Sequence, residues 1–331
     1  MDNQAVPITL EQFQQTVQTI EGEIGKVIVG QEELVRNVLI AIIAGGHVLL
    51  EGVPGLGKTL LIRTLSQAFE LKFNRVQFTP DLMPADIIGT ELLQVDDSGK
   101  RYFKFRPGPV FVNLFLADEV NRATPKTQSA MLQVMQEKII TVAGRTYTLK
   151  PPFFVLATQN PLEMEGTYPL PEAQLDRFMF KLDVRFPNLT ELIEILERTT
   201  SESQPEAQTA TDGKMLIDMG QLARQIPVAS HIKTYVAKVL LATHPGQIDS
   251  PDMVKQYVRF GASPRGAQAM ILGAKVNALF NNRYNVAFSD VQAVMHAALR
   301  HRLILNFEGE AAGIKVDDII SSIAEIVKHE E

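Results

Sequence analysis

The 331-residue sequence contains no cysteine and no tryptophan. Without cysteine there can be no disulfide and no thiolate metal site, which fits a reducing compartment. It also has no run of the roughly 20 apolar residues that a membrane-spanning helix needs, because the best candidate, 38–44, stops at Gly45. The start, MDNQAVPITLEQFQ, lacks the apolar segment of a secretory signal. We therefore expect a cytoplasmic protein with no membrane span.

An excess of positive charge is missing as well. The chain has 32 Lys and Arg against 38 Asp and Glu, a formal net charge of −6. This balance gives no overall electrostatic reason to bind nucleic acid, although a local basic patch is compatible with it. The length suits about two domains of ordinary size.

The two halves of the chain differ in their apolar pattern. Short apolar runs alternate with helical patterns in the first half, and they predict strands at 47–52, 74–79, 112–119, 152–160 and 178–186. Such alternation is typical of a mostly parallel sheet covered on both faces. After Pro187, apolar residues recur at spacings of three and four, as in helices. We predict an α/β domain over 1–187 and a helical domain over 188–331, with a flexible polar loop at 201–214.

Two segments of the first half read as β-hairpins. Residues 91–105 pass through an Asp-Asp-Ser-Gly turn into alternating apolar and polar residues. Residues 138–152 repeat this pattern around Ala143-Gly144. Both hairpins are candidates for insertions in the α/β domain.

The stretch EGVPGLGKTL (51–60) follows one predicted strand and precedes a predicted helix. Gly52, Gly57, Lys58 and Thr59 fit the pattern G-x-x-x-x-G-K-[ST], which in this context predicts a P-loop. Glycines let successive backbone N–H groups curl around phosphate oxygens at a helix N-terminus. Lys58 would reach the β and γ phosphates, and Thr59 would ligate Mg²⁺. The predicted ligands are therefore ATP and Mg²⁺.

Two later strands end in polar residues. The run NLFLADE ends in Asp118 and Glu119, and FFVLATQN ends in Asn160. The carboxyl ends of such strands meet where ligands of open α/β sheets bind. We expect Asp118 to hold Mg²⁺, Glu119 to orient or deprotonate the attacking water, and Asn160 to hold that water. Acidic residues also commonly begin the helix after a strand, and an Asn before Pro161 is also a common turn residue.

In this order, the motifs GVPGLGKT, FLADEVNRA, ATQNP, LPEAQLDRF and GASPRG resemble those of the MoxR family of AAA+ ATPases. The resemblance runs from about Gly30 to the end of the helical domain, and the two hairpins fall where this branch carries inserts. It implies a P-loop AAA+ core with β-hairpin inserts followed by an all-α lid. It also implies that the hairpins face the pore of the ring, with packing against a neighbouring subunit as the alternative.

The same resemblance implies roles for further residues. Arg177 resembles an arginine finger that enters a neighbouring subunit's site, and Arg265 resembles the sensor arginine that reaches from the lid to the γ-phosphate. Without the resemblance, the position of Arg177 between a predicted helix and a predicted strand favours a surface ion pair or a helix cap. Arg122 is a second cation of possible intersubunit use. The segment VGQ, with Gly30 and Gln31, resembles the lining of the adenine pocket. The nucleotide-binding residues implied by the P-loop match are Gly52, Val53, Pro54, Gly55, Leu56, Gly57, Lys58, Thr59 and Leu60.

The function implied is Mg-dependent ATP hydrolysis by a homo-oligomer, a hexameric ring, whose lid swings when the γ-phosphate is lost. The resemblance further implies a chaperone that matures or activates partner proteins, including by metal cofactor insertion, often with a von Willebrand factor A domain partner. No motif in the sequence identifies a client.

Three other functions fit part of the sequence. A nucleic-acid motor or loader would use the basic and aromatic residues of 100–106, against the net acidity of the chain. A nucleotide-gated scaffold without turnover would have no need for Glu119 beside Asp118. A P-loop kinase would need an acceptor-binding motif, which we do not find.

Overall fold

The computed structural model describes residues 8–161, 166–201 and 205–327. Its centre is a parallel five-stranded sheet with the strand order β2–β5–β8–β1–β9. The strands are β1 (Val48–Glu51), β2 (Phe73–Gln77), β5 (Leu114–Asp118), β8 (Phe154–Gln159) and β9 (Phe180–Asp183). Each overlaps one of the five predicted runs, so the parallel sheet predicted from the sequence is confirmed.

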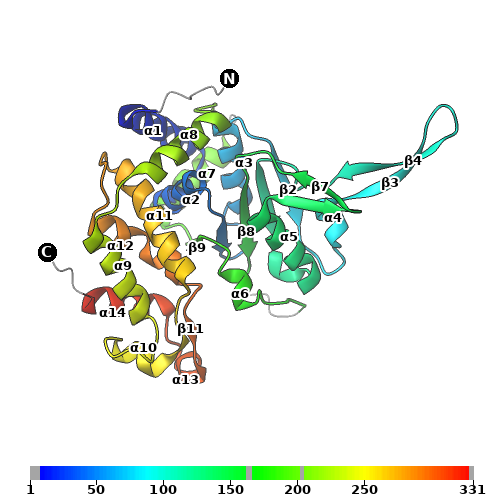
Figure 1. The fold of residues 1–331 in the computed structure, drawn as a ribbon. Coiled ribbons are helices and arrows are strands. Elements are labelled where there is room, and N and C mark those ends of the chain that lie inside the picture. The colour runs from blue at the N-terminus through cyan, green and yellow to red at the C-terminus, as the bar shows by residue number, and fades with distance from the viewer. Residues whose placement is uncertain (1–7, 162–165, 202–204, 328–331) are drawn as a thin grey trace.

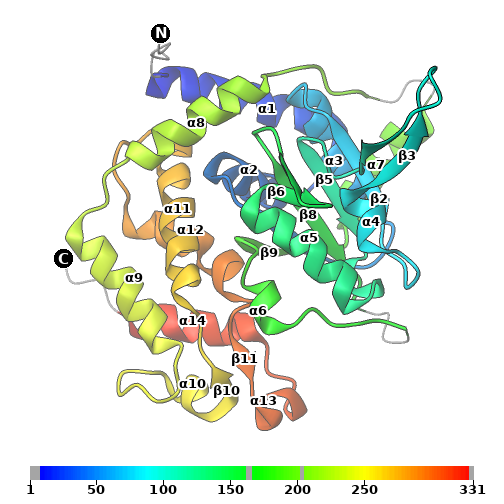
Figure 2. The same ribbon diagram turned by 45° about the vertical axis from the view of Figure 1, so that its right-hand side comes forward.

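Alternate residues of these strands face opposite sides of the sheet, and both sides are buried. Val48 and Leu50 face the side covered by helices α1 (Leu10–Val27), α2 (Glu32–Ala44) and α3 (Lys58–Ala68). Leu49 faces the other side, where helices α4 (Pro84–Ile88) and α5 (Pro125–Glu137) cover the strands (Figure 2). The continuous apolar character of the strands follows from this burial on both faces.

The second half is helical, as the spacing of its apolar residues predicts. Its helices are α7 (Leu189–Thr200), α8 (Gly213–Gln225), α9 (Ser230–Ala242), α10 (Asp252–Tyr257), α11 (Pro264–Phe280), α12 (Phe288–Leu299), α13 (Phe307–Ala311) and α14 (Val316–Ile326). The sequence did not predict one short ladder here. Strand β10 (Val258–Phe260) pairs antiparallel with β11 (Ile304–Leu305). Across the described ranges, no helix combines the length and hydrophobicity that crossing a bilayer requires.

The helical half and the sheet share one apolar core. Helix α2 packs against α8 and α11, and α12 packs against β9. At Gly220 of α8 the helices approach so closely that an added Cβ would lie 2.7 Å from the Ile43 carbonyl oxygen. One continuous buried cluster therefore extends from the strands into the helical half. The division at residue 187 stays a prediction.

The polar segment before α8 contains no helix or strand over 205–212, but it is attached to the α/β half. The backbone N–H groups of Ala210 and Thr211 donate to the Ala68 carbonyl at 2.8 and 3.0 Å. The Gln208 N–H donates to the Glu23 carboxylate at 2.9 Å. These contacts hold the described part of the predicted flexible loop against α1 and α3.

Both predicted hairpins are present. Strands β3 (Gly89–Val95) and β4 (Arg101–Pro107) form the longer one, which projects from the body in Figure 1. Strands β6 (Ile139–Val142) and β7 (Arg145–Thr148) form the shorter one. The ring of Phe105 in β4 stacks on Tyr147 in β7, with centroids 4.0 Å apart. The longer hairpin is therefore supported at its base by the shorter one.

His47, just before β1, is buried and neutral. The Val155 N–H donates to Nδ1 at 3.0 Å, so Nε2 carries the proton and donates to the Met135 carbonyl at 3.0 Å. Burial lowers the pKa of His47 to about 4. Protonation of His47 would place a hydrogen on Nδ1 directly opposite the Val155 N–H, and this hydrogen bond would be lost. The folded state therefore resists a proton that the unfolded chain accepts near pH 6.5.

We expect His47 to cause a loss of stability in acid. Between pH 6.5 and pH 4 the unfolded chain binds the proton and the folded chain does not, so the free energy of unfolding falls by about 3 kcal/mol as the pH is lowered. Denaturant unfolding should show a smaller fall for His47→Gln than for the wild type. Gln in place of the exposed His231 serves as the control. Equal falls in wild type and His47→Gln would contradict this assignment.

Candidate functional site

The glycine-rich loop connects the carboxyl end of β1 to the first turn of α3. Gly55 and Gly57 have φ values of +86° and +75°, which side chains rarely tolerate, and no atom lies within 4 Å of a Cβ built on either. The loop therefore leaves open space in front of the N-terminus of α3, whose dipole favours an anion. Lys58 Nζ donates to the Gly52 carbonyl across the loop.

The ammonium group of Lys58 is partly withdrawn from water. Burial lowers the pKa of Lys58, and the carboxylates of Asp118, Glu119 and Glu51 oppose that shift. These three carboxylates come from the ends of β5 and β1, so the fold gathers them around one cation. A bound phosphate would add negative charge at the same place and stabilise the protonated ammonium.

Asp118 ends β5 and is buried. The Thr158 hydroxyl donates to its Oδ1 at 2.5 Å, and Arg75 donates to its Oδ2 from Nε and Nη2 at 3.0 and 2.7 Å. Sequence reasoning missed both partners. Arg75 lies on β2 and Thr158 on β8, the two strands that flank β5, so only the order of the strands reveals their role.

Glu119 follows Asp118 in a left-handed conformation, with φ of +54°. Its N–H donates to the Thr158 hydroxyl at 2.8 Å, so Thr158 joins both acidic residues. Its carboxylate accepts from Gln77 Nε2 at 2.6 Å and from Arg122 Nη1 at 2.9 Å. Arg122, a candidate for contact with another subunit, thus pairs with Glu119 in its own chain.

Asn160 is buried directly after β8, the strand between β1 and β5. The neighbouring Gln159 carbonyl accepts a hydrogen bond from the Gly52 N–H at 3.3 Å, so the end of β8 adjoins the start of the P-loop. The structure therefore brings Lys58, Thr59, Asp118, Glu119 and Asn160 to one edge of the sheet, as their positions after three strands predict.

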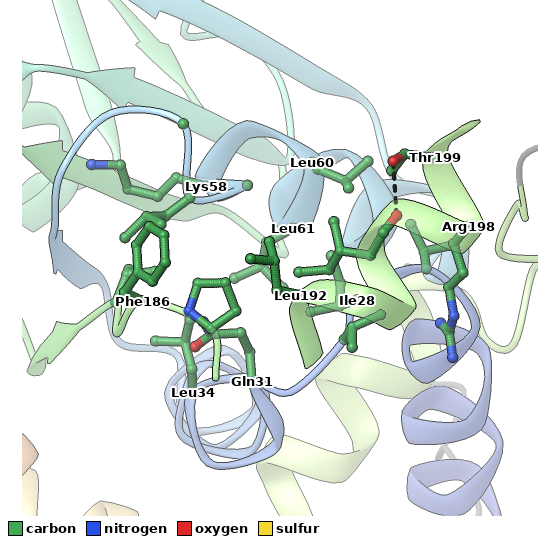
Figure 3. Close-up of a pocket in the computed structure, with 18 residues that line it drawn as sticks. Ile28, Gln31, Leu34, Lys58, Leu60, Leu61, Phe186, Leu192, Arg198 and Thr199 are labelled. Atoms are coloured by element: carbon green, nitrogen blue, oxygen red, sulfur yellow. Dashed lines mark hydrogen bonds between the residues drawn. The ribbon is translucent and has the colours of Figure 1, made fainter. Parts of the chain in front are cut away.

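An apolar cavity of about 340 Å³ adjoins the P-loop (Figure 3). Six predicted nucleotide-binding residues line it: Gln31, Gly55, Leu56, Gly57, Lys58 and Leu60. Sequence reasoning missed its opposite wall, formed by Val184, Phe186 and Pro187 after β9 and by Leu192, Ile195, Arg198 and Thr199 of α7. A flat, largely apolar ligand group such as a purine base fits this lining.

Other predicted nucleotide-binding residues do not line the cavity. Gly30 lies behind it, where its carbonyl accepts from Arg185 Nη2 at 2.6 Å, and Arg185 also pairs with Glu191 at the start of α7. Gly52, Val53, Pro54 and Thr59 lie between the end of β1 and the first turn of α3, outside the cavity lining. Gly30 thus supports the segment that carries Gln31.

The remaining two predicted residues, Arg177 and Arg265, lie at the other end of the sheet. Arg177 precedes β9, and the Met179 N–H donates to the His47 carbonyl at the amino end of β1, whereas the P-loop follows the carboxyl end of β1. Arg265 Nη1 lies 3.5 Å from Asp176 Oδ2. The structure thus places Arg265 beside the Arg177 loop and not beside the P-loop of its own chain, because the lid docks on this end of the sheet.

Comparisons with known proteins agree with this architecture. Residues 47–180 match the family described as "ATPase family associated with various cellular activities (AAA)", and residues 251–323 match the AAA lid domain. The chain is 42% identical to Chaperone MoxR1 of Mycobacterium tuberculosis, covering 98% of this chain and 86% of that protein. It is 30% identical to Protein MoxR of Methylorubrum extorquens, covering 93% of each.

A crystal structure of a candidate ATPase from Cytophaga hutchinsonii is similar to the whole chain. Its TM-score is 0.90 and its sequence is 40% identical, with 97% of each chain covered. The P-loop, the acidic strand end and the helical lid thus occur together with near full-length similarity. The chain belongs to the MoxR family of AAA+ ATPases, and it is an ATPase.

Proposed function

We propose that the chain hydrolyses ATP at sites shared between subunits of a closed ring, a hexamer by resemblance to the family, and that it thereby remodels partner proteins. The observation that carries this proposal is the separation of the P-loop from Arg177 and Arg265 at opposite ends of one sheet. Arg177 and Arg265 would then reach a γ-phosphate only from another subunit. A head-to-tail contact that closes by rotation supplies them at every site.

In this proposal the adenine of ATP occupies the apolar cavity, between Gln31 on one side and the α7 wall on the other. The phosphates lie against the N-terminus of α3. Lys58 exchanges its hydrogen bond to the Gly52 carbonyl for phosphate oxygens, where a charge-assisted hydrogen bond is stronger. The three P-loop glycines contribute backbone N–H groups to the same oxygens.

Mg²⁺ would be held by the Thr59 hydroxyl and the Asp118 carboxylate, because both offer the hard oxygen ligands that this ion prefers. Among the described residues, no group of three His, Cys, Asp or Glu side chains is arranged to hold a metal unaided. The nucleotide phosphates would therefore complete the ligand set. When bound, the ion neutralises negative charge on the phosphates.

Glu119 is the general base of the proposed reaction. Its carboxylate orients the attacking water and accepts its proton, while the Asn160 side chain holds the water from the neighbouring strand end. The hydrogen bonds from Gln77 and Arg122 fix the Glu119 carboxylate. Arginines from the next subunit stabilise the charge that develops on the γ-phosphate.

Partner proteins are the proposed substrates of the ring. One full-length relative is named a chaperone. The longer hairpin exposes Leu93, Val95 and Phe103 on one face, an apolar surface that suits protein contact. Phe105 stacks on Tyr147 and is therefore not free to stack on bases. This contact argues against the alternative of a nucleic-acid motor or loader. A von Willebrand factor A domain partner and metal cofactor insertion are further proposals by family resemblance.

Lys58→Ala tests the nucleotide site directly. Loss of a charge-assisted hydrogen bond to phosphate should weaken binding of a fluorescent ATP analogue roughly 10- to 100-fold. Lys72→Ala, which removes an exposed lysine at the other end of the sheet, should bind like the wild type. Thermal unfolding of both variants checks that the fold survives. Equal affinity of wild type and Lys58→Ala would remove the loop from phosphate binding.

A further inference from the structure

Asp176 connects the lid to the loop that carries Arg177. It follows α6 (Glu172–Leu175), and its carboxylate accepts hydrogen bonds from the Ser263 hydroxyl at 2.8 and 2.9 Å. Arg302 Nε donates to Oδ1 at 2.8 Å, and Arg265 Nη1 lies 3.5 Å from Oδ2. Three lid side chains therefore converge on one carboxylate of the α/β half.

Arg302 also holds the backbone on both sides of Arg177. Its side chain is only 3% exposed. Its Nη2 donates to the carbonyl of Asp176 at 3.1 Å and to that of Phe178 at 2.7 Å. These are the residues immediately before and after Arg177, whose position is thus fixed by a lid residue. Among the described residues, the Arg177 guanidinium has no hydrogen-bonded partner, so it is free to meet an anion.

Charge explains why a carboxylate is needed at this place. Arg265 and Arg302 both lie beside this carboxylate, and like charges repel in a partly buried environment. The Asp176 carboxylate offsets part of this repulsion and accepts a hydrogen bond from the buried Arg302. Arg265 lies in the first turn of α11, where its positive charge opposes the helix dipole, so the carboxylate also stabilises it there.

We propose that Asp176 is a positioning residue for the shared site: it holds Arg265 beside Arg177 and fixes the loop between them, so that a neighbouring subunit receives both arginines as one unit. This inference rests on the proposed function. It assigns both arginines to the donor side of the contact between subunits. Asp176 acts through them and does not itself touch the nucleotide.

The test is the hydrolysis rate of Asp176→Asn, alone and in equal mixtures with other variants. Misplaced arginines should lower kcat about 10- to 100-fold, because small displacements of catalytic groups cost this much. The affinity for ATP should stay unchanged, since the pocket lies at the other end of the sheet. In an equal mixture with Lys58→Ala, activity should return at about a quarter of the sites. Each of these sites combines the intact P-loop of an Asp176→Asn subunit with the intact arginines of a neighbouring Lys58→Ala subunit. Mixing with Arg177→Ala should restore none.

This pattern separates positioning from a general loss of structure. An unfolded subunit would restore nothing with either partner. Because Asn leaves the buried Arg302 without a counter-charge, Asp176→Asn is also at risk of unfolding. Ser263→Ala and Ser263→Thr form a second, milder pair: both keep the Arg302 contact, and only Thr keeps a hydroxyl for Asp176. Ser263→Ala should lower kcat about tenfold relative to Ser263→Thr.

Each outcome bears on the proposal. The assignment of Asp176 is overturned if Asp176→Asn keeps kcat within about twofold of the wild type. It is also overturned if a mixture of Asp176→Asn with Arg177→Ala regains activity. If Asp176→Asn does not fold, equal rates for the two Ser263 variants overturn it. The mixture of Lys58→Ala with Arg177→Ala is the control for shared sites. If this control restores nothing, the proposed function itself fails, and the assignment of Asp176 fails with it.

Discussion

Replacing Arg177 by alanine is expected to lower the rate of ATP hydrolysis roughly 10³- to 10⁵-fold while ATP affinity persists. A finger arginine stabilises charge that develops only in the transition state, so its loss reduces kcat and leaves ground-state binding in place. The wild-type activity per subunit should also rise with protein concentration, because a dissociated subunit lacks a finger. Steady-state hydrolysis of Mg-ATP at a series of concentrations measures both effects.

Arg259→Ala is a matched control for this prediction. Arg259 is an exposed arginine near α6, where it pairs with Glu172 at 3.4 Å. In the sequence it lies far from both Arg177 and the P-loop. Its loss should change the rate little, because exposed ion pairs contribute little. Activity that is independent of concentration and indifferent to Arg177 would show that each chain completes its own site. The ring proposal would then give way to a self-contained ATPase.

Glu119→Gln should bind ATP like the wild type and hydrolyse it roughly 10²- to 10⁴-fold more slowly, the usual contribution of a general base. Gln keeps the size of the side chain and an oxygen that accepts from Gln77 and Arg122, but it cannot take a proton. Single-turnover hydrolysis, which isolates chemistry from product release, is the measurement.

Glu137→Gln provides a control for charge alone, since Glu137 is exposed at the end of α5. It should leave the rate unchanged. If Glu119→Gln turned over ATP at the wild-type rate, Glu119 would have no part in proton transfer. A loss of ATP affinity in Glu119→Gln would instead indicate that this residue shapes the binding site.

The fold and half of the site could be read from the sequence because their signals are local. A strand, a glycine loop and a helix follow one another in 47–68, and the acidic pair ends its own strand. Arg75 and Gln77 carry no such signal. They lie on β2, and their contacts with Asp118 and Glu119 exist only because β2 is the neighbour of β5.

The place of Arg265 could not be predicted for a related reason. Its sequence context identifies a helix start, which is a local property. Whether that helix start meets the P-loop or the loop before β9 depends on how the lid docks, and that is decided by the packing of α2, α8, α11 and α12. Likewise, part of the far wall of the apolar cavity comes from α7, which is distant in sequence from the P-loop.

The apolar core shared by the sheet and the helical half limits how this protein can move. A hinge needs a few residues that bend between two bodies with little contact, whereas packed helices permit only small sliding movements, called shear. With α2 pressed against α8 and α12 against β9, a wide swing of the lid within one chain would expose apolar surface. In the proposed ring, large displacements would therefore arise between neighbouring chains, and each chain would move nearly as a rigid body.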